Sequence, residues 1–377
     1  MLNATTLEKE FPVLAAVKNQ PCISVIIPFN PKMISKNDLA AALKNVYKQV
    51  KENLYNNYTA KASNELLDKL RQVIGNLDYT THKKSIALYV SPVVEQVYYL
   101  DIDVHEKVIV DTSFEIRDIV HNKKDDHEFL LLSISSKHEN IYVGNSINLR
   151  KIVSNNIEHV QRDLHGVVAN FTDANKVKET RLKKFLHYID NGLPLIFKTY
   201  SLPLFVAGTE KTLGYFRRIT KHQAQIAGFI NGNFDNVTEA ELRKLFALQL
   251  RNWKLVKENY LRNRIKMAQN NLQLATGIHD VWIYANRRYK QLLIVEKDFY
   301  CPAFVTAKGE TIFSKSNEQN EVIAKDAVDD VIEKVLQNGG DVEFIDDLKD
   351  YNRIALIDVQ NKNELRFLHE ARSSYPL

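Results

Sequence analysis

The feature that most constrains the fold of this chain is the repeated change between strand-like and helix-like spacing of its apolar residues. Residues 22–29 form a β-branched run that ends at prolines, as expected of a buried strand followed by a turn. In residues 35–77, leucines and valines recur at helical spacing with few helix breakers, which predicts two helices. Three later runs rich in Val, Tyr and Ile predict an antiparallel meander: Ser85–Val90, Val93–Ile102 and Glu106–Val110. The first part of the chain is therefore expected to be an α+β domain.

A polar run at His121–Glu128 interrupts the apolar pattern, so we expect a domain boundary near residue 125. Beyond it, Phe129–Ser135 and Asn140–Gly144 predict a β-hairpin. The pattern therefore restarts with strands in a second domain.

An amphipathic helix is predicted at Ala174–Asn191, where Gly192 and Pro194 are expected to end it. The apolar runs Leu195–Phe197 and Leu204–Ala207 are then expected to be core strands. A helix of about 35 residues is predicted next, at Thr238–Gln273. It begins with a capping box, since Thr238 is followed three positions later by Glu241. We expect this helix to link two domains.

Beyond residue 273 the pattern alternates between strands and a helix, as in an α/β unit with a parallel or mixed sheet. The helix is expected at Ala324–Asn338, followed by Gly339 and Gly340, which suit the left-handed backbone of a helix C-terminus. The strands are expected at Val281–Ala285, Leu292–Val295, Val342–Ile345 and Ile354–Ile357.

These patterns predict three domains, at residues 1–125, 126–272 and 273–377, of mixed α/β and α+β class. Lys and Arg number 51 against 46 Asp and Glu, so the net charge of +5 does not by itself indicate a polyanion partner. The charges are unevenly spread, because residues 318–377 hold fourteen acidic and seven basic side chains. The last domain is thus acidic and the body of the chain basic.

Two cysteines, Cys22 and Cys301, are too few for a zinc site built on cysteine pairs, and they suit a reducing compartment. The N-terminus has no apolar core of signal-peptide length, and no run of 18 apolar residues occurs. We therefore expect a cytoplasmic protein with no membrane association.

No catalytic motif is complete in the sequence. The stretch Ala207–Thr212 lacks the first glycine of a phosphate-binding loop, and G-x-S-x-G, H-E-x-x-H and C-x-x-C are absent. His121 with His127, or with Asp125 and Asp126, could be drawn as a metal cluster, but a solvated turn is the favoured interpretation. We expect neither a cofactor nor a metal.

Two clusters of basic residues are candidate RNA-binding sites, and solvated charged surfaces are the alternative interpretation of both. The first lies on the predicted amphipathic helix and comprises Lys176, Lys178, Arg181, Lys183 and Lys184. The second lies beside Tyr289 and comprises Arg287, Arg288 and Lys290.

Taken in order, five blocks resemble the bacterial relatives of archaeo-eukaryotic class 1 translation release factors, the superfamily that includes Pelota. The blocks are SVIIPF (24–29), FLLLSISSKHENIYVG (129–144), LPLFVAGTEKTLGYFRRIT (202–220), HDVWIYANRRYKQLLIVE (279–296) and DAVDDVIEKVLQNGGDVEFID (326–346). The resemblance implies a release-factor-like middle domain and a third domain similar to kink-turn-binding ribosomal proteins. It also implies ribosomal or transfer RNA as a partner, and a GTPase partner.

The resemblance does not extend to the catalytic Gly-Gly-Gln loop of release factors. The matching tip loop here is His165–Lys176, where Gly166 is the sole glycine and no Gln follows it. Without paired glycines and a positioned amide, the loop lacks the groups that assist attack on the peptidyl-tRNA ester. The first hypothesis is therefore a non-catalytic protein that binds RNA or the ribosome in rescue, protection or dormancy.

Two alternatives stay open. The chain could be a hydrolase of peptidyl-tRNA or another RNA-linked ester, with His165, Asn170 or Asp173 of the tip loop in place of the missing Gln. It could also be a protein-interaction scaffold whose acidic last domain meets a basic partner.

Overall fold

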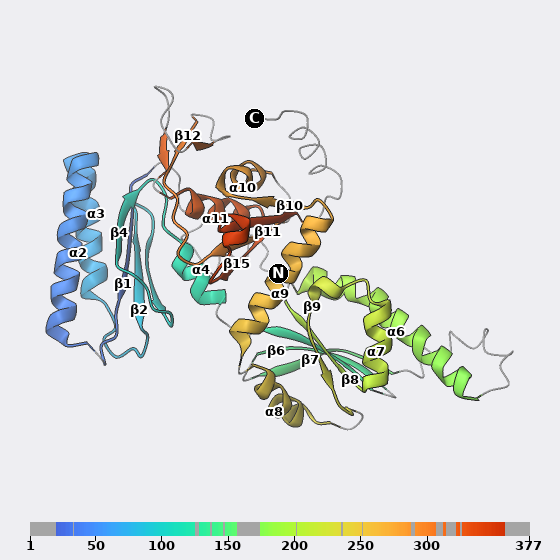
Figure 1. Ribbon diagram of the computed structural model, residues 1–377. Coiled ribbons are helices and arrows are strands. Elements are labelled where there is room, and N and C mark those ends of the chain that lie inside the picture. Colours follow the sequence, from blue (N-terminus) through green and yellow to red (C-terminus); the bar gives the residue numbers. More distant parts are fainter. Residues whose placement is uncertain are drawn as a thin grey trace, which may run out of the picture. The chain divides into compact units, whose positions relative to one another are not determined.

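The computed structural model of the chain describes residues 20–32, 34–124, 128–135, 138–145, 148–156, 174–200, 202–234, 237–250, 252–287, 291–306, 312–313, 322–324 and 326–358. The chain forms two compact units, which are coloured along the sequence in Figure 1. The middle unit is residues 126–272. The terminal unit combines residues 2–125, its N-terminal part, with residues 273–377, its C-terminal part.

The N-terminal part is built on an antiparallel sheet of order β3-β2-β1-β4. Its strands are β1 (Cys22–Pro28), β2 (Ser85–Val90), β3 (Glu95–Leu100) and β4 (Lys107–Asp111). The predicted meander is wrong in one respect, because β4 pairs with β1 and not with β3. The reason is the burial of β1, whose residues 22–27 are all inside and therefore need a hydrogen-bonded strand on each side.

Two helices, α2 (Lys36–Asn57) and α3 (Ala60–Gly75), supply the apolar layer that packs on this sheet, as the spacing predicted. Ser35 caps α2 by accepting a hydrogen bond from the backbone N–H of Asp38. The helix α2 buries a stripe at helical spacing, formed by Leu39, Leu43, Val46, Val50 and Leu54. A further helix, α4 (Arg117–Lys124), occupies the first half of the polar run that was expected to be a boundary loop.

The C-terminal part has a mixed sheet of order β10-β16-β11-β15, in which β11 and β15 are parallel and the other pairs antiparallel. The strands are β10 (Leu274–Thr276), β11 (Gln291–Glu296), β15 (Asp341–Ile345) and β16 (Ile354–Asp358). A small antiparallel sheet of order β13-β12-β14 comprises β12 (Ala303–Val305), β13 (Ile312–Phe313) and β14 (Val322–Ala324). The predicted mixed sheet is confirmed.

The strand predicted at Val281–Ala285 is wrong, since these residues belong to the helix α10 (Ile278–Ala285). The buried residues Val281, Trp282, Tyr284 and Ala285 follow helical spacing, and Gly277, at φ +79°, turns the chain from β10 into the helix.

The last helix, α11 (Ala327–Gln337), ends at two glycines that do different things. Gly339 has φ +73°, as predicted for a left-handed position. Gly340 does not have a positive φ. A Cβ atom there would instead lie 2.8 Å from the carbonyl oxygen of Gln291, so this glycine permits close approach of two backbone segments.

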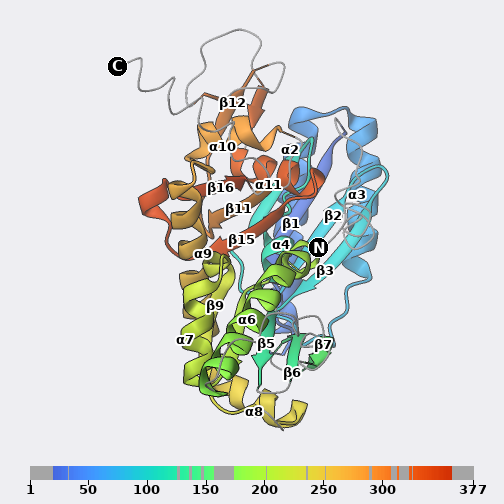
Figure 2. The same ribbon diagram turned by 90° about the vertical axis from the view of Figure 1, so that its right-hand side faces the viewer.

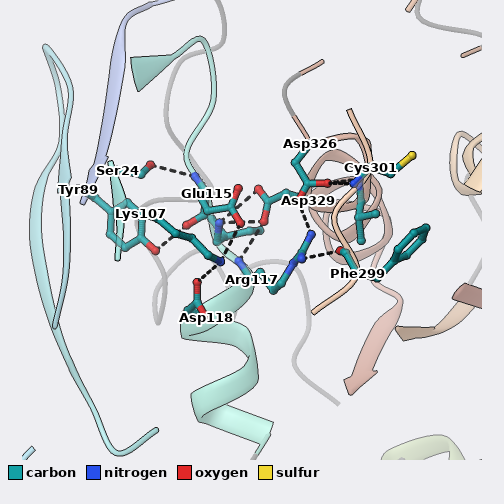
Figure 3. A network of polar contacts seen from close by, with 12 residues as sticks. Ser24, Tyr89, Lys107, Glu115, Arg117, Asp118, Phe299, Cys301, Asp326 and Asp329 are labelled. Atoms are coloured by element: carbon teal, nitrogen blue, oxygen red, sulfur yellow. Dashed lines mark hydrogen bonds and ion pairs between the residues drawn. The ribbon is translucent and has the colours of Figure 1, made fainter. Parts of the chain in front are cut away.

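A polar network joins the two parts of the terminal unit (Figure 3). Asp329 of α11 accepts hydrogen bonds from the backbone N–H groups of Ile116 (3.1 Å) and Arg117 (3.0 Å), and thereby caps the start of α4. The buried Arg117 side chain forms an ion pair with Asp326 and donates a hydrogen bond to the carbonyl of Phe299 at 2.6 Å. Residues more than 200 positions apart are thus held together by a buried ion pair and by hydrogen bonds from the backbone to a buried carboxylate.

The middle unit is built on a mixed sheet of order β7-β6-β5-β8-β9. Its strands are β5 (Phe129–Ile134), β6 (His138–Gly144), β7 (Leu149–Asn156), β8 (Leu204–Gly208) and β9 (Ile226–Asn231). The predicted hairpin is confirmed by the antiparallel pairing of β5 with β6. The strand β8 pairs with β5 on its other side, in parallel.

The helix α6 (Ala174–Thr199) runs past the predicted end at Gly192 and Pro194, so the strand predicted at Leu195–Phe197 is wrong. Proline costs the helix one hydrogen bond. Packing outweighs that loss, because Leu193 is buried in the core and Ile196 and Phe197 pack against it, while Leu195 is 70% exposed.

After β8 the chain forms α7 (Glu210–Ile219), a short 3-10 turn η3 (Gln223–Gln225) and β9. The long helix predicted at Thr238–Gln273 is two helices, α8 (Glu239–Leu250) and α9 (Trp253–Asn270). The break lets Phe246 and Trp253 share one core cluster beneath the sheet with Phe129 and Phe205. The predicted capping box is confirmed by hydrogen bonds in both directions between Thr238 and Glu241.

Candidate nucleic-acid interface

The helix α6 presents cations and an aromatic ring to solvent along one face. Arg181, Lys184 and Tyr188 are three and four positions apart, a spacing that places them on one side of a helix. Arg181 is exposed, Lys184 is half-buried and Tyr188 is 49% exposed. The adjoining face is fixed to the sheet by Phe185, Leu186, Ile189 and Leu193, which are all buried. The core therefore determines which face of α6 meets water.

Lys183 lies on another side of α6 and has a partner. Its ammonium forms an ion pair with Glu179 at 2.7 Å and lies 5.1 Å from the ring centroid of Tyr215 in α7. Hydrogen bonds from Lys183 and Tyr215 hold the pKa of Glu179 below its ordinary value, and the same bond to Glu179 raises the pKa of Lys183. Lys183 is therefore partly engaged within the protein.

The structure describes only some of the cations that the sequence predicted as RNA-binding residues. Lys178 is exposed, and the backbone of Lys176 belongs to α6, although its side chain lies outside the described residues. Arg287 belongs to the terminal unit, where its guanidinium lies 4.5 Å from the ring centroid of Tyr284. Arg288 and Lys290 lie outside the described residues, as do His165, Gly166, Asn170 and Asp173 of the tip loop.

Sequence reasoning did not select the cations of α7, which packs beside α6. The two helices lie side by side (Figure 2). Both contribute to one core cluster, which contains Leu213 and Phe216 of α7 and Phe185 and Ile189 of α6. The exposed cations of α7 and of the turn after it are Lys211, Arg217, Arg218 and Lys221. The available signal was the pair Arg217–Arg218 in a block that had been quoted only for its resemblance.

A cleft of about 650 Å³ in the terminal unit offers no comparable surface. Each Lys or Arg that lines it has a carboxylate partner: Lys84 with Asp103, Lys107 with Asp118, Arg117 with Asp326, and Lys297 with Asp346. Because these cations are already neutralised, the cleft has little to offer a phosphate.

Two further properties concern the described part of the chain. No group of three or more His, Cys, Asp or Glu side chains there is placed to hold a metal ion. Within the same residues, every helix is too short or too polar to span a lipid bilayer.

Comparison with solved structures finds proteins that match this chain at low sequence identity. An archaeal translation termination factor, aRF1, matches at 13% identity over 95% of this chain and 98% of that chain, with a TM-score of 0.24. A ribosome-bound archaeal Pelota, studied with ABCE1, matches at 10% identity over 94% of each chain, with a TM-score of 0.35. Dom34 of S. cerevisiae matches at 10% identity over 74% and 88%, with a TM-score of 0.30.

All three TM-scores are below 0.5. No curated protein matches the chain. The sequence comparison with protein families gives a match at residues 128–287, to the family described as bacterial archaeo-eukaryotic release factor family 3. The matched segment contains α6 and α7 together with the sheet that supports them. Over these residues the chain is similar to the bacterial relatives of the archaeo-eukaryotic release factors, in agreement with the resemblance seen in the sequence.

Proposed function

We propose that the protein binds ribosomal or transfer RNA through the exposed basic surface of α6, as a non-catalytic factor in ribosome rescue, protection or dormancy in the cytoplasm. The observation that carries this proposal is the row of Arg181, Lys184 and Tyr188 on the solvent face of a helix whose other face is buried. Two cations bind the phosphate backbone, and the neighbouring ring offers a surface on which a base stacks.

The family relationship supports a role connected with the ribosome, because the matched segment is that of a release factor relative. By the same resemblance the proposal extends to a GTPase partner. The absence of a Gly-Gly-Gln sequence supports the non-catalytic part of the proposal.

The direct test of the proposal is charge reversal on α6. The variant Arg181→Glu/Lys183→Glu/Lys184→Glu should weaken binding to labelled oligouridine and flatten its salt dependence. With Lys183 also in contact with phosphate, α6 neutralises about three phosphates and contributes roughly −2 to the wild-type slope of log affinity against log salt, since each contact on a single strand contributes about −0.7. The fold should persist, because the buried residues of α6 are untouched.

A charge-matched control is available on α2 of the terminal unit, where Lys44, Lys48 and Lys51 are exposed. Reversing these three changes the net charge by the same amount and should leave the slope near its wild-type value. If the α6 variant keeps the wild-type slope, the assignment of RNA binding to α6 is wrong.

The non-catalytic part of the proposal has its own expected outcome. Purified protein should cleave peptidyl-tRNA at the background rate, because loss of a positioned transition-state group typically costs about 10²–10³ in rate. Rapid release of the peptide, lost on changing His165 or Asp173, would instead support the hydrolase alternative.

A further inference from the structure

We propose that the RNA-binding surface continues from α6 onto α7, where Arg217 and Arg218 bind phosphates through guanidinium groups that aromatic rings hold in place. This inference rests on the proposed function and names contacts that neither the family match nor the sequence pattern assigns. The helix α7 thus extends the RNA-binding surface of α6.

The two arginines are exposed, and each has a ring beneath it. The guanidinium of Arg217 lies 4.3 Å from the ring centroid of Phe229 in β9, and that of Arg218 lies 5.0 Å from the centroid of Tyr215. Arg218 also donates a hydrogen bond from Nε to the carbonyl of Gly214 at 3.1 Å. Stacking restrains a guanidinium group while its N–H edges stay available, which lowers the entropy lost when a ligand binds.

Neither arginine has a carboxylate partner within ion-pair distance in the described part of the chain. Lys183 differs in this respect, since Glu179 engages it. An arginine with no carboxylate partner keeps its full charge, and in Arg218, whose Nε donates to Gly214, the two terminal nitrogens keep their N–H donors for an incoming anion. The planar fork of N–H groups matches two phosphate oxygens, which a lysine ammonium does not reproduce.

The ring of Tyr215 connects the two helices into one surface. Lys183 of α6 and Arg218 of α7 lie 5.1 Å and 5.0 Å from the centroid of this same ring. The exposed Lys211 and Lys221 add charge at the start of α7 and beyond its end. A phosphate backbone that binds Lys183 therefore has Arg218 within reach, and Arg217 is the next residue of the same helix.

The test replaces the two arginines by lysines, which keep the charge and lose the fork. Arg217→Lys/Arg218→Lys should bind labelled oligouridine about tenfold more weakly, because each lysine loses the second, parallel N–H···O bond of the bidentate fork. A tenfold change corresponds to about 1.4 kcal/mol. The salt slope should stay unchanged, because the number of cations is the same. The double Glu variant should lose about 1.4 units of slope, from two contacts.

The matched control is Arg71→Lys, since Arg71 lies 5.4 Å from the ring centroid of Tyr47 in the terminal unit and belongs to no proposed site. It should bind oligouridine with wild-type affinity. If the α6 variant loses binding while both α7 variants bind like wild type, the extension onto α7 is wrong and the proposed function survives. If the wild type does not bind RNA, the proposed function itself fails. Thermal unfolding at the wild-type temperature confirms that each variant is folded.

Discussion

Buried carboxylates govern how the terminal unit responds to pH. Asp329 is buried among other acids, and its burial raises its pKa well above the ordinary value although it caps α4. Burial also raises the pKa of its neighbour Asp330 to about 6, against an ordinary value of 3.8, with Lys334 opposing the shift. A carboxyl group whose pKa is higher in the folded state than in the unfolded state destabilises the fold once both forms are ionised.

The sign of this effect gives a prediction for Asp330→Asn. Between about pH 3.8 and 6 the folded state holds a proton that the unfolded state has lost, so the contribution of Asp330 to stability falls as the pH rises through that window. The asparagine variant has no such loss. Its free energy of unfolding, relative to wild type, should therefore increase by about 2.4 kcal/mol between pH 4 and pH 7.

Urea unfolding at several pH values measures this difference. The exposed Asp350, replaced by Asn, controls for the loss of one negative charge in the same unit. A difference between Asp330→Asn and wild type that does not grow with pH would show that the Asp330 carboxyl is not destabilised by burial.

At the scale of the element, the glycines after α11 separate two reasons for using glycine. Alanine at Gly339 meets nothing within 4 Å but must adopt φ +73°, which costs about 1 kcal/mol. Alanine at Gly340 would place its Cβ 2.8 Å from the carbonyl oxygen of Gln291 and 2.9 Å from that of Val335. Backbone atoms cannot move aside as a side chain does, so we expect a cost of about 3 kcal/mol, the upper end for overpacking.

Chemical denaturation of the two variants tests this order. Gly340→Ala should be clearly less stable than Gly339→Ala. The opposite order would mean that β11 and the end of α11 do not approach as closely as the structure has them.

The sequence predicts elements well where local signals and packing agree. The spacing of leucines and valines in residues 35–77 predicted α2 and α3, and Thr238 with Glu241 predicted the start of α8. It fails where tertiary packing overrides a local signal. Pro194 is a breaker by itself, and the contacts of Leu193 and Phe197 with the core keep α6 intact around it.

The candidate RNA-binding site could likewise be predicted only in part. The cations of α6 could be found from the sequence, because charge and apolar periodicity alternate along one helix. Arg217 and Arg218 could not, since their significance depends on Phe229 and Tyr215, and on the packing of α7 against α6. Periodicity within one helix does not show which other helix lies beside it.

At the scale of the whole molecule, residues from the two ends of the chain share one hydrophobic core. One core cluster contains Tyr89 and Ile119 from the N-terminal part together with Val328 and Leu293 from the C-terminal part. These residues come together in one terminal unit although residues 126–272 separate them in the chain. A reading from one end to the other could not reveal this, because apolar periodicity is a local property. The division into three domains, at residues 125 and 272, stays a prediction.

We propose above all that basic helices of the middle unit bind ribosomal or transfer RNA electrostatically. The most direct measurement is co-sedimentation of the purified protein with ribosomes at low and at moderate salt. We expect wild-type protein to sediment with ribosomes at low salt and to be released as salt rises, since counterions compete for the phosphates. The variant Arg181→Glu/Lys183→Glu/Lys184→Glu should stay in the supernatant throughout. Wild-type protein that never sediments, or a variant that sediments with wild-type salt dependence, would contradict the claim.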